Sequence, residues 1–253
     1  MISLQSFGRN LNAVVIGGSG GIGSALVAQL LMCPDVKRVT AFSRSGFLVD
    51  EEVPRAQLRK LKCGHIDLMS ESSIVDASDL LSEVPIDLII VATGILHSKD
   101  IRPEKSLRSL APDSFSTVMQ MNALAPMLVA KHFLPSMRKA GKSVFVALSA
   151  RVGSISDNRL GGWYSYRASK AALNMLLKTL SVESLRTHPQ LIVAGLHPGT
   201  VDTALSCPFQ RNVEPTKLFS PSQSAGYLLD VIDGLDHAHS GGVFAWDGSQ
   251  IEA

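Results

Sequence analysis

Short apolar segments alternate along the chain with longer segments that carry the spacing of amphipathic helices. The apolar segments cover residues 13–16, 36–42, 86–92, 144–148 and 191–196, and two weaker ones cover residues 58–63 and 242–246. Turn residues bound each of them, which predicts buried β-strands. The helical spacing covers about residues 21–32, 72–82, 114–139, 164–186 and 222–235.

This alternation of strand and helix predicts one α/β domain over residues 1–253. Near-continuous apolar strands are typical of a parallel sheet that helices cover on both faces through right-handed crossovers, the doubly wound architecture. The chain has no internal repeat, no Ser/Pro-rich linker and no block of like charge that would divide it. Ligands of such sheets bind beyond the carboxyl ends of the strands, so we expect the functional residues in the loops there.

The first of these loops is rich in glycine. Residues 17–23 read Gly-Gly-Ser-Gly-Gly-Ile-Gly and connect the strand 13–16 directly to an amphipathic helix. Such glycines allow a tight turn and a close approach of the backbone to a pyrophosphate, which then lies on the N–H groups of the following helix. An ordinary glycine-rich turn is the alternative. The context predicts a Rossmann-type dinucleotide site, and the loop residues that would bind are Gly17, Ser19, Gly21, Ile22 and Gly23.

The end of the second strand indicates which dinucleotide binds. An acidic residue about 20 residues beyond the glycines takes the ribose 2′-hydroxyl of NAD, whereas an arginine nearby accommodates the 2′-phosphate of NADP. Here Ser43 closes the strand and Arg44 follows it, so the site offers a hydroxyl and a guanidinium and no carboxylate. This favours NADP(H) over NAD. A solvated loop arginine is the alternative interpretation of Arg44.

Composition and charge exclude several other classes of protein. The formal net charge is +2 and 18% of the residues are charged, so no strong field would hold nucleic acid or an anionic membrane surface. The N-terminus lacks the features of a signal peptide, and no apolar segment approaches the ~20 residues of a membrane helix. Three cysteines without paired spacing, and the isolated pair His237 and His239, predict neither a disulfide framework nor a metal site. A small-molecule ligand and a cytoplasmic location are expected.

A second chemical signal lies at the start of the helix 164–186. Tyr166 and Lys170 stand four residues apart, which places both side chains on one face of the helix. An ammonium near a phenol favours the ionised phenol, so we expect Lys170 to lower the pKa of Tyr166 toward neutrality for acid/base chemistry at a carbonyl. Taken alone, this spacing also occurs by chance.

Together these motifs make the chain resemble the short-chain dehydrogenase/reductase family over nearly its whole length. The glycine pattern Gly17-x-x-x-Gly21-x-Gly23 and the pair Tyr166-x-x-x-Lys170 carry the match. Residues 149–155, 164–170 and 244–248 look like the branch that contains C-factor-like proteins and sniffer-type carbonyl reductases.

The resemblance implies roles for further residues. Tyr166 and Lys170 would also contact the ribose of the cofactor, and Asn122 would be the catalytic asparagine that bends its helix. The segment 92–94 stands at the family's Asn-Ala-Gly turn, and the segment 198–203 would cover the nicotinamide. The other residues that are implied to contact the cofactor, the first of them at its adenine and the last near its carboxamide, are Asp67, Ala92, Thr93, Gly94, Pro198, Gly199, Val201 and Thr203.

Position 150 departs from the family. The substrate-orienting serine of the family lies three residues before the glycine of a Ser-x-x-Gly motif, and with Gly153 as that glycine the position holds Ala150. Ser149 can replace the missing hydroxyl only if the strand ends or bulges there, because successive strand side chains point to opposite faces. We expect Ser149 to serve in this way, with Ser154 as a further candidate.

The expected function is NADP(H)-dependent hydride transfer between the nicotinamide and a carbonyl or alcohol group of a small molecule. Tyr166 would be the general acid/base, with Lys170, Asn122 and Ser149 completing the catalytic set. The alternative is a catalytically weak, NADP-binding signalling or regulatory protein, which Ala150 would suit. The charged loop 97–110 is interpreted as a solvated surface loop in preference to a binding site for an acidic substrate. A homo-oligomer is possible.

Overall fold

The computed structural model describes residues 2–46 and 53–252, and these contain the predicted parallel sheet. Its strands are β1 (Leu11–Ile16), β2 (Val36–Ser43), β3 (Leu61–His65), β4 (Leu88–Val91), β5 (Ser143–Leu148), β6 (Leu191–His197) and β9 (Val243–Ala245). They form a seven-stranded sheet in the order β3-β2-β1-β4-β5-β6-β9, and every neighbouring pair is parallel. The predicted Rossmann-type, doubly wound fold is confirmed.

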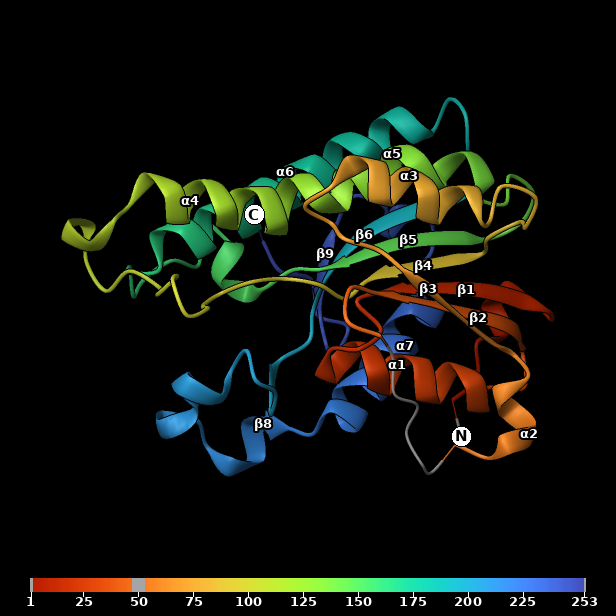
Figure 1. Cartoon of the computed structure of the whole chain (residues 1–253), viewed down its shortest axis with the longest axis horizontal. Coiled ribbons are helices and arrows are strands. Elements are labelled where there is room, and N and C mark those ends of the chain that lie inside the picture. The colour runs from red at the N-terminus through yellow and green to blue at the C-terminus, as the bar shows by residue number, and fades with distance from the viewer. Residues whose placement is uncertain (1, 47–52, 253) are drawn as a thin grey trace.

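Helices cover both faces of this sheet (Figure 1). One face carries α1 (Gly21–Met32) and α7 (Pro221–Gly234), with the short α2 (Arg55–Leu58) beside α1, and the other carries α3 (Glu71–Asp79), α4 (Pro112–Met119), α5 (Ala125–Phe133) and α6 (Tyr164–Ser184). The strand side chains alternate between the two layers: Val15 packs with α1 and α7, whereas Ile16 packs with α3, α5 and α6. Burial of apolar surface in these two layers is the main source of stability.

The prediction of one continuous helix over residues 114–139 is wrong. The structure has α4 and α5 as separate helices joined by the π-helical turn η3 (Gln120–Leu124), and α5 ends at Phe133, where a 3-10 turn over Leu134–Ser136 follows. Pro126 stands in the first turn of α5 and has no N–H to donate to the carbonyl four residues earlier, which favours the wider π turn. Pro135 ends the helix for the same reason.

The predicted element boundaries elsewhere shift by a few residues. β4 spans Leu88–Val91 instead of 86–92, and Ile86 forms an isolated bridge with Met137. The weak segment 58–63 corresponds to β3 at Leu61–His65, because residues 55–58 form α2.

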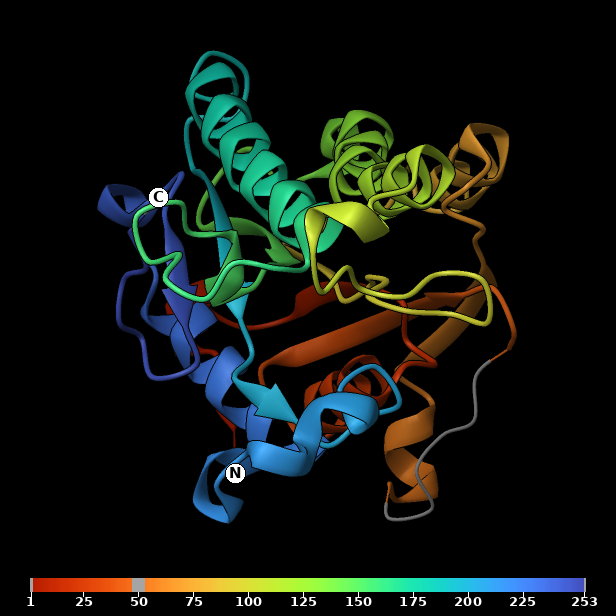
Figure 2. The same ribbon diagram turned by 90° about the vertical axis from the view of Figure 1, so that its left-hand side faces the viewer.

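The carboxyl ends of the strands carry the longest connections of the chain. Residues 92–111 follow β4, residues 149–163 follow β5, and residues 198–220 follow β6. The last of these contains a separate two-stranded sheet of β7 (Thr200–Val201) and β8 (Leu218–Phe219). Figure 2 looks onto this edge, where the yellow, green and light-blue segments come together in front of the sheet.

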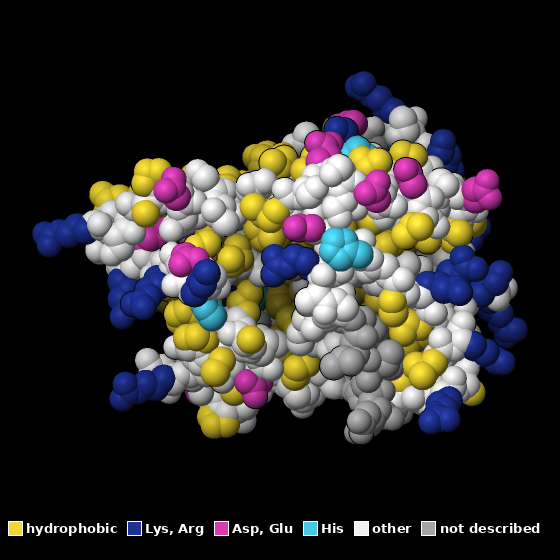
Figure 3. Space-filling model, in the orientation of Figure 1, with side chains coloured by type: hydrophobic (Ala, Val, Ile, Leu, Met, Phe, Trp, Pro, Cys, Tyr) yellow, Lys and Arg dark blue, Asp and Glu magenta, His cyan; other side chains and the backbone are white. Residues whose placement is uncertain are grey.

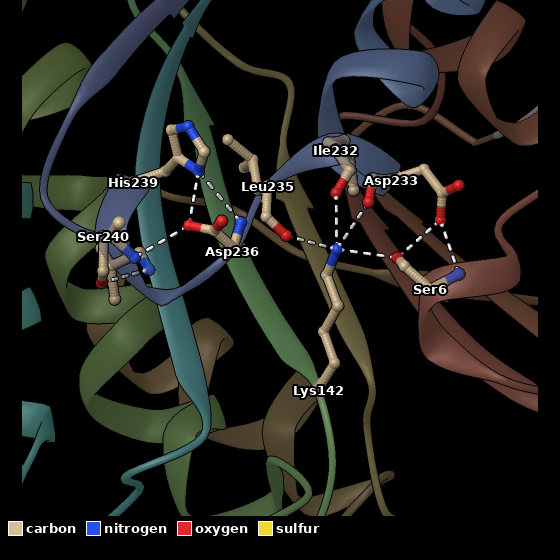
Figure 4. Close-up of polar contacts among 10 residues, drawn as sticks. Ser6, Lys142, Ile232, Asp233, Leu235, Asp236, His239 and Ser240 are labelled. Atoms are coloured by element: carbon tan, nitrogen blue, oxygen red, sulfur yellow. Dashed lines mark hydrogen bonds and ion pairs between the residues drawn. The ribbon is translucent and has the colours of Figure 1, made fainter.

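At the opposite side of the molecule, Lys142 fastens the N-terminal segment to the end of α7 (Figure 4). Its ammonium donates to the carbonyl oxygens of Ile232 (3.2 Å), Asp233 (2.8 Å) and Leu235 (2.6 Å), and to the hydroxyl of Ser6 (2.7 Å). A cation at this position satisfies carbonyls that a helix C-terminus leaves free. Burial lowers the pKa of Lys142. The contact is structural and lies away from the loops at the carboxyl edge of the sheet.

Candidate active site

A cavity of about 500 Å³ opens at the carboxyl edge of the sheet. In Figure 3 the surface is hollowed between the upper helices and the lower segment, with hydrophobic side chains inside the hollow. The predicted site residues that line the cavity are Gly17, Ser19, Gly21, Ile22, Ser43, Arg44, Asp67, Ala92, Thr93, Gly94, Ser149, Tyr166, Lys170, Pro198 and Thr203. Four predicted residues, Gly23, Asn122, Gly199 and Val201, lie outside this lining.

The glycine loop has the geometry of a phosphate cradle. Gly17 has a φ of +89°, which residues other than glycine rarely adopt. A Cβ on Gly23 would lie 2.1 Å from the Gly17 carbonyl oxygen, so only glycine allows the turn to close on the start of α1. Within the described residues, α1 has neither a capping side chain nor an acid in its first turn, so its N-terminal N–H groups are left for an anion.

Ser43, Arg44 and Asp67 also line the cavity, and the residue before Ser43 is joined to the glycine turn because the Phe42 carbonyl accepts the N–H groups of Gly17 and Gly18. The Ser43 hydroxyl donates to the Gly46 carbonyl at 2.9 Å and so fixes the turn after β2. Asp67 is the single carboxylate among the described lining residues, and it accepts the Met69 N–H at 3.0 Å. The charged side chain at the end of β2 is the Arg44 guanidinium. A cation at this position fits the 2′-phosphate of a phosphorylated dinucleotide.

The deep end of the cavity brings Tyr166 and Lys170 together. The Lys170 ammonium lies 5.7 Å from the centre of the Tyr166 ring and donates to the Leu148 carbonyl at 2.7 Å. Gly94 separates Lys170 from Asn122: a Cβ on Gly94 would lie 3.5 Å from Lys170 Nζ and 3.4 Å from Asn122 Oδ1. The Thr93 hydroxyl is buried in the same wall and has no partner within the described residues, so a polar group of a ligand can satisfy it.

Asn122 does not line the cavity itself but holds the main chain of Ile95, which does. It lies in the π turn η3, and its amide accepts the Ile95 N–H at 2.7 Å and donates to the Ile95 carbonyl at 2.8 Å. The same amide donates to the Ser169 hydroxyl at 3.0 Å, which ties the turn to α6. Asn122 thus lies where the helix is interrupted by a π turn, and π turns of this kind are frequent at functional sites.

Burial dominates the electrostatics of the Tyr166–Lys170 pair. It raises the pKa of Tyr166 to about 12 and lowers the pKa of Lys170 to about 8. The predicted fall of the Tyr166 pKa toward neutrality is therefore wrong for the chain alone, because burial of the phenol against Leu96 and Ala150 outweighs the effect of the Lys170 ammonium, which donates to the Leu148 carbonyl. Tyr166 is protonated at neutral pH and can donate a proton.

Ser149 and Ala150 both lie against α6, beyond the end of β5 at Leu148. The Ser149 N–H still donates to the Leu196 carbonyl at 2.8 Å, so strand pairing and the alternation of side chains extend to Ser149, and they end before Ala150. The Ser149 hydroxyl donates to Asn174 Oδ1 on α6 at 2.6 Å, while Ala150 packs against Tyr166. Ser154 is buried and accepts the Asp157 N–H at 3.2 Å. Neither serine hydroxyl is bonded to Tyr166, and the expected role of Ser149 stays a prediction.

The segment 198–203 closes the cavity from the side of α1. Gly199 has a φ of +79°, and a Cβ on it would lie 2.7 Å from the Phe219 ring. The Pro198 carbonyl accepts the Ser224 hydroxyl at 2.8 Å, which anchors the turn to α7. Thr203 lies over the start of α1, where a Cβ on Gly21 would come within 2.7 Å of Thr203 Cγ2.

An aromatic cluster covers Tyr166 on the side away from the glycine loop. The Trp163 ring lies 6.2 Å from the Tyr166 ring and 5.0 Å from the Phe209 ring, both in edge-to-face arrangements. The centre of the Phe209 ring also lies 5.7 Å from the centre of the His97 ring. His97 Nε2 lies 3.2 Å and 3.1 Å from the carbonyl oxygens of Ala204 and Leu205, so the loop after β4 is joined to the segment after β7.

The model of the short chain dehydrogenase family matches residues 11–214. The chain belongs to this family. Tyr166 and Lys170 stand at the start of α6 and the glycine loop stands between β1 and α1, where the family resemblance expected them.

Individual relatives agree with this assignment. The C-signal of Myxococcus xanthus is 37% identical over 131 residues, which cover 52% of this chain and 74% of that protein. The structure of an NADPH-bound carbonyl reductase from chicken fatty liver has a TM-score of 0.81 at 28% identity, and the match covers 97% of this chain and 100% of that one. The carbonyl reductase Sniffer of D. melanogaster matches with the same coverage and TM-score 0.81 at 22% identity, which shows the shared fold. The C-signal relative confirms the expected likeness to C-factor-like proteins, and the Sniffer structure shares the fold.

The sequence pattern gives no role to several residues that surround Tyr166. The loop 97–110 is largely exposed, as predicted, but its Glu104 is only 3% exposed and accepts hydrogen bonds from Ser165. The sequence pattern also predicts no role for Trp163, Phe209 or His97. The sequence signal for Trp163 is its position after Gly161 and Gly162, since all three have positive φ.

The described residues contain neither a metal-binding cluster nor a membrane-spanning helix. They hold no group of three or more His, Cys, Asp or Glu side chains that could bind a metal ion. No helix among them is long and apolar enough to span a membrane.

Proposed function

We propose that this protein is an NADP(H)-dependent oxidoreductase that transfers a hydride between the nicotinamide and the carbonyl or alcohol group of a small molecule, and that it works as a carbonyl reductase. The observation that carries the proposal is the position of Tyr166 and Lys170 at the deep end of the cavity whose other end is the glycine cradle. The relation to an NADPH-bound carbonyl reductase supports it.

The cofactor follows from the fit of the cavity. The glycine turn and the start of α1 would hold the pyrophosphate, Arg44 the 2′-phosphate, and Asp67 the adenine. Pro198 and Thr203 would lie over the nicotinamide. When bound, NADPH supplies the hydride, and the residues of this chain orient the substrate and handle the proton.

Tyr166 is the proposed proton donor to the substrate oxygen. Its pKa of about 12 keeps the hydroxyl protonated at neutral pH, and the buried Lys170 ammonium beside it favours the phenolate that remains after the transfer. Asn122 holds the main chain of Ile95 and the Ser169 hydroxyl, and so keeps the wall opposite Lys170 in place. In the reverse direction the same groups accept the proton.

A second function is favoured by one observation. Ala150 stands beside Tyr166 where the family has a serine, so the protein could bind NADP(H) as a signalling or regulatory module with little turnover. The relative named C-signal is in keeping with this alternative.

Turnover separates the two functions. A panel of ketones and aldehydes with NADPH would be measured on the wild type, on Tyr166→Phe, and on Tyr164→Phe as a matched control whose side chain is exposed. We expect Tyr166→Phe to lose about 10³-fold in kcat/KM while its NADPH affinity stays close to wild type, because the phenol acts on the substrate oxygen. Tight NADPH binding without turnover of any compound would favour the regulatory module, and equal rates for Tyr166→Phe and wild type would remove Tyr166 as the donor.

A further inference from the structure

The loop after β4 carries a buried carboxylate that the proposed reaction does not use. Glu104 is 3% exposed. Its Oε2 accepts the Ser165 N–H at 3.2 Å and its Oε1 accepts the Ser165 hydroxyl. No Lys, Arg or His in the described part of the chain forms an ion pair with it. Its negative charge is instead placed at the N-terminus of α6, where the helix dipole favours an anion.

Glu104 also holds the backbone that leads into α6. Its carbonyl oxygen accepts the Trp163 N–H at 2.5 Å, and a Cβ on Gly162 would lie 3.3 Å from that oxygen. Gly161, Gly162 and Trp163 have φ angles of +63°, +66° and +51° in succession. A bulky aromatic residue in this left-handed region is unfavourable by itself and persists only where its surroundings enforce it. Glu104 enforces this conformation through its carboxylate, which binds Ser165, and through its backbone carbonyl, which binds the Trp163 N–H.

The enforced turn directs the Trp163 ring over the catalytic tyrosine. The Trp163 ring packs edge-to-face with both Tyr166 and Phe209. The hydrophobic cluster around Tyr166 also contains Leu96, Ala150, Val152 and Leu205. The phenyl ring of Phe209 thus marks the kind of group that the Trp163 face accepts.

We infer that Trp163 is the specificity-determining wall of the substrate site, that Glu104 is the positioning residue that holds it there, and that the substrate is a carbonyl compound with an uncharged, planar apolar group next to the carbonyl. The inference rests on the proposed function. A substrate ring that reaches Tyr166 takes the place of the Phe209 ring on Trp163, because edge-to-face and offset contacts with an indole favour flat apolar groups. A carboxylate on that ring is disfavoured, because it would lose its hydration against these apolar side chains.

The first test compares three aldehydes with NADPH: benzaldehyde, butyraldehyde and para-carboxybenzaldehyde. In the wild type we expect kcat/KM for benzaldehyde to exceed the other two by about 10-fold or more. Trp163→Leu should abolish that preference while the rate with butyraldehyde changes by less than about 3-fold. Equal losses with benzaldehyde and butyraldehyde, or a wild-type preference for the carboxylated aldehyde, would overturn the inference.

The positioning role of Glu104 predicts a specific pattern. Glu104→Ala should lose the benzaldehyde preference through KM, with the NADPH dissociation constant unchanged, and Glu104→Gln should restore most of it because the amide oxygen can still accept from Ser165. Ser165→Ala, which removes one of the two contacts, gives an intermediate variant if Glu104→Ala does not fold. Glu214→Ala, at an exposed carboxylate, is the matched control. An unchanged preference in folded Glu104→Ala would refute the role.

A binding measurement keeps the inference separate from the proposed function. The chain has two tryptophans, so Trp246→Phe leaves Trp163 as the single tryptophan, whose emission is separated from that of tyrosine by excitation beyond the tyrosine absorption band and from that of NADPH by its emission wavelength. We expect acetophenone, but not butanone, to quench this fluorescence saturably in the NADPH complex, and Glu104→Ala to weaken the quenching. If the wild type binds NADPH but reduces no aldehyde, the proposed function fails, and the quenching alone then decides the inference. Identical quenching by both ketones contradicts it.

Discussion

The two ends of the cavity are built in different ways. At the end proposed for the cofactor, the pyrophosphate cradle is formed by backbone, namely the glycine turn and the start of α1, with the side chains of Arg44 and Asp67 beside it. At the end proposed for the substrate, side chains from three separate connections cluster around Tyr166, which are Leu96, Trp163, Leu205 and Phe209, and of these Leu205 lines the cavity itself. A backbone surface tolerates no added atom, whereas a side-chain surface depends on what holds each side chain in position.

This difference decides how each end responds to substitution. The cofactor end should fail when a methyl group enters the glycine turn, irrespective of charge. The substrate end should change selectivity when a tether such as Glu104 is removed, while the cofactor end continues to bind. Variants that affect both ends equally would contradict this division.

The largest effect is expected for Gly23→Ala. The new Cβ would lie 2.1 Å from the Gly17 carbonyl oxygen, so the turn must open and the N–H groups of α1 move away from the pyrophosphate. We expect NADPH affinity to fall by about 100-fold, the equivalent of about 3 kcal/mol of overpacking. Fluorescence titration of NADPH measures it. Gly234→Ala is the control, since a Cβ there meets nothing within 4 Å, and a folded Gly23→Ala with wild-type affinity would refute the cradle.

The same contrast explains what the sequence could predict. The parallel sheet and the glycine loop depend on local pattern, and their positions were predicted to within a few residues at β1, α1 and β6. The break between α4 and α5 was missed because the helical spacing of 114–139 continues through Pro126 without interruption. Glu104 was missed because a glutamate in a charged loop looks solvated until the contact with Ser165, 61 residues away, is known.

Ser149 shows a further limit of sequence reasoning. The strand ends at Leu148, as the expected role of Ser149 required, yet the N–H of Ser149 still pairs with β6 and its side chain keeps the strand alternation. Where a strand ends by hydrogen bonding and where its side chains stop alternating are two different questions. The pattern of residues addresses only the first.

The next largest effect concerns the choice of nucleotide at the cofactor end. Arg44→Ala should reduce NADPH affinity about 10-fold and leave NADH affinity unchanged, because one charge-assisted contact to a phosphate contributes roughly 1.5–3 kcal/mol. Titration of both nucleotides on the wild type and the variant tests this. Arg9→Ala, at an exposed position, is the control. Equal losses for the two nucleotides would place Arg44 away from the 2′-phosphate.

A smaller effect is expected at the boundary between the two ends. Ala150 packs against Tyr166, so Ala150→Ser introduces a hydroxyl beside the proposed proton donor, and we expect kcat/KM for an active substrate to rise about 5-fold, a fraction of what a placed oxyanion donor contributes. Ser149→Ala tests the predicted role of Ser149, and a change of less than about 3-fold would mean that its hydroxyl serves only the bond to Asn174. A loss near 10²-fold in Ser149→Ala would instead establish Ser149 as the substrate-orienting hydroxyl.

The smallest effect concerns stability at the deep end, where Lys170 is buried. Its folded-state pKa is lowered from 10.5 to about 8, so the folded chain binds this proton less readily than the unfolded chain. Below pH 8 both states are protonated and the cost of the buried ammonium is present in full; between about pH 8 and 10.5 the unfolded state binds more protons, and stability rises with pH. Lys170→Met removes this cost but also the hydrogen bond to Leu148.

We therefore expect Lys170→Met to be about 1 kcal/mol more stable than the wild type at pH 7, and no more stable at pH 10.5. Denaturant unfolding of both proteins at the two pH values measures the difference, with Lys62→Met, at an exposed position on β3, as the control. A difference that does not shrink with rising pH would mean that the ammonium is not desolvated. A stabilised but inactive Lys170→Met would show that this end of the cavity keeps a destabilising charge because the proton donor beside it requires one.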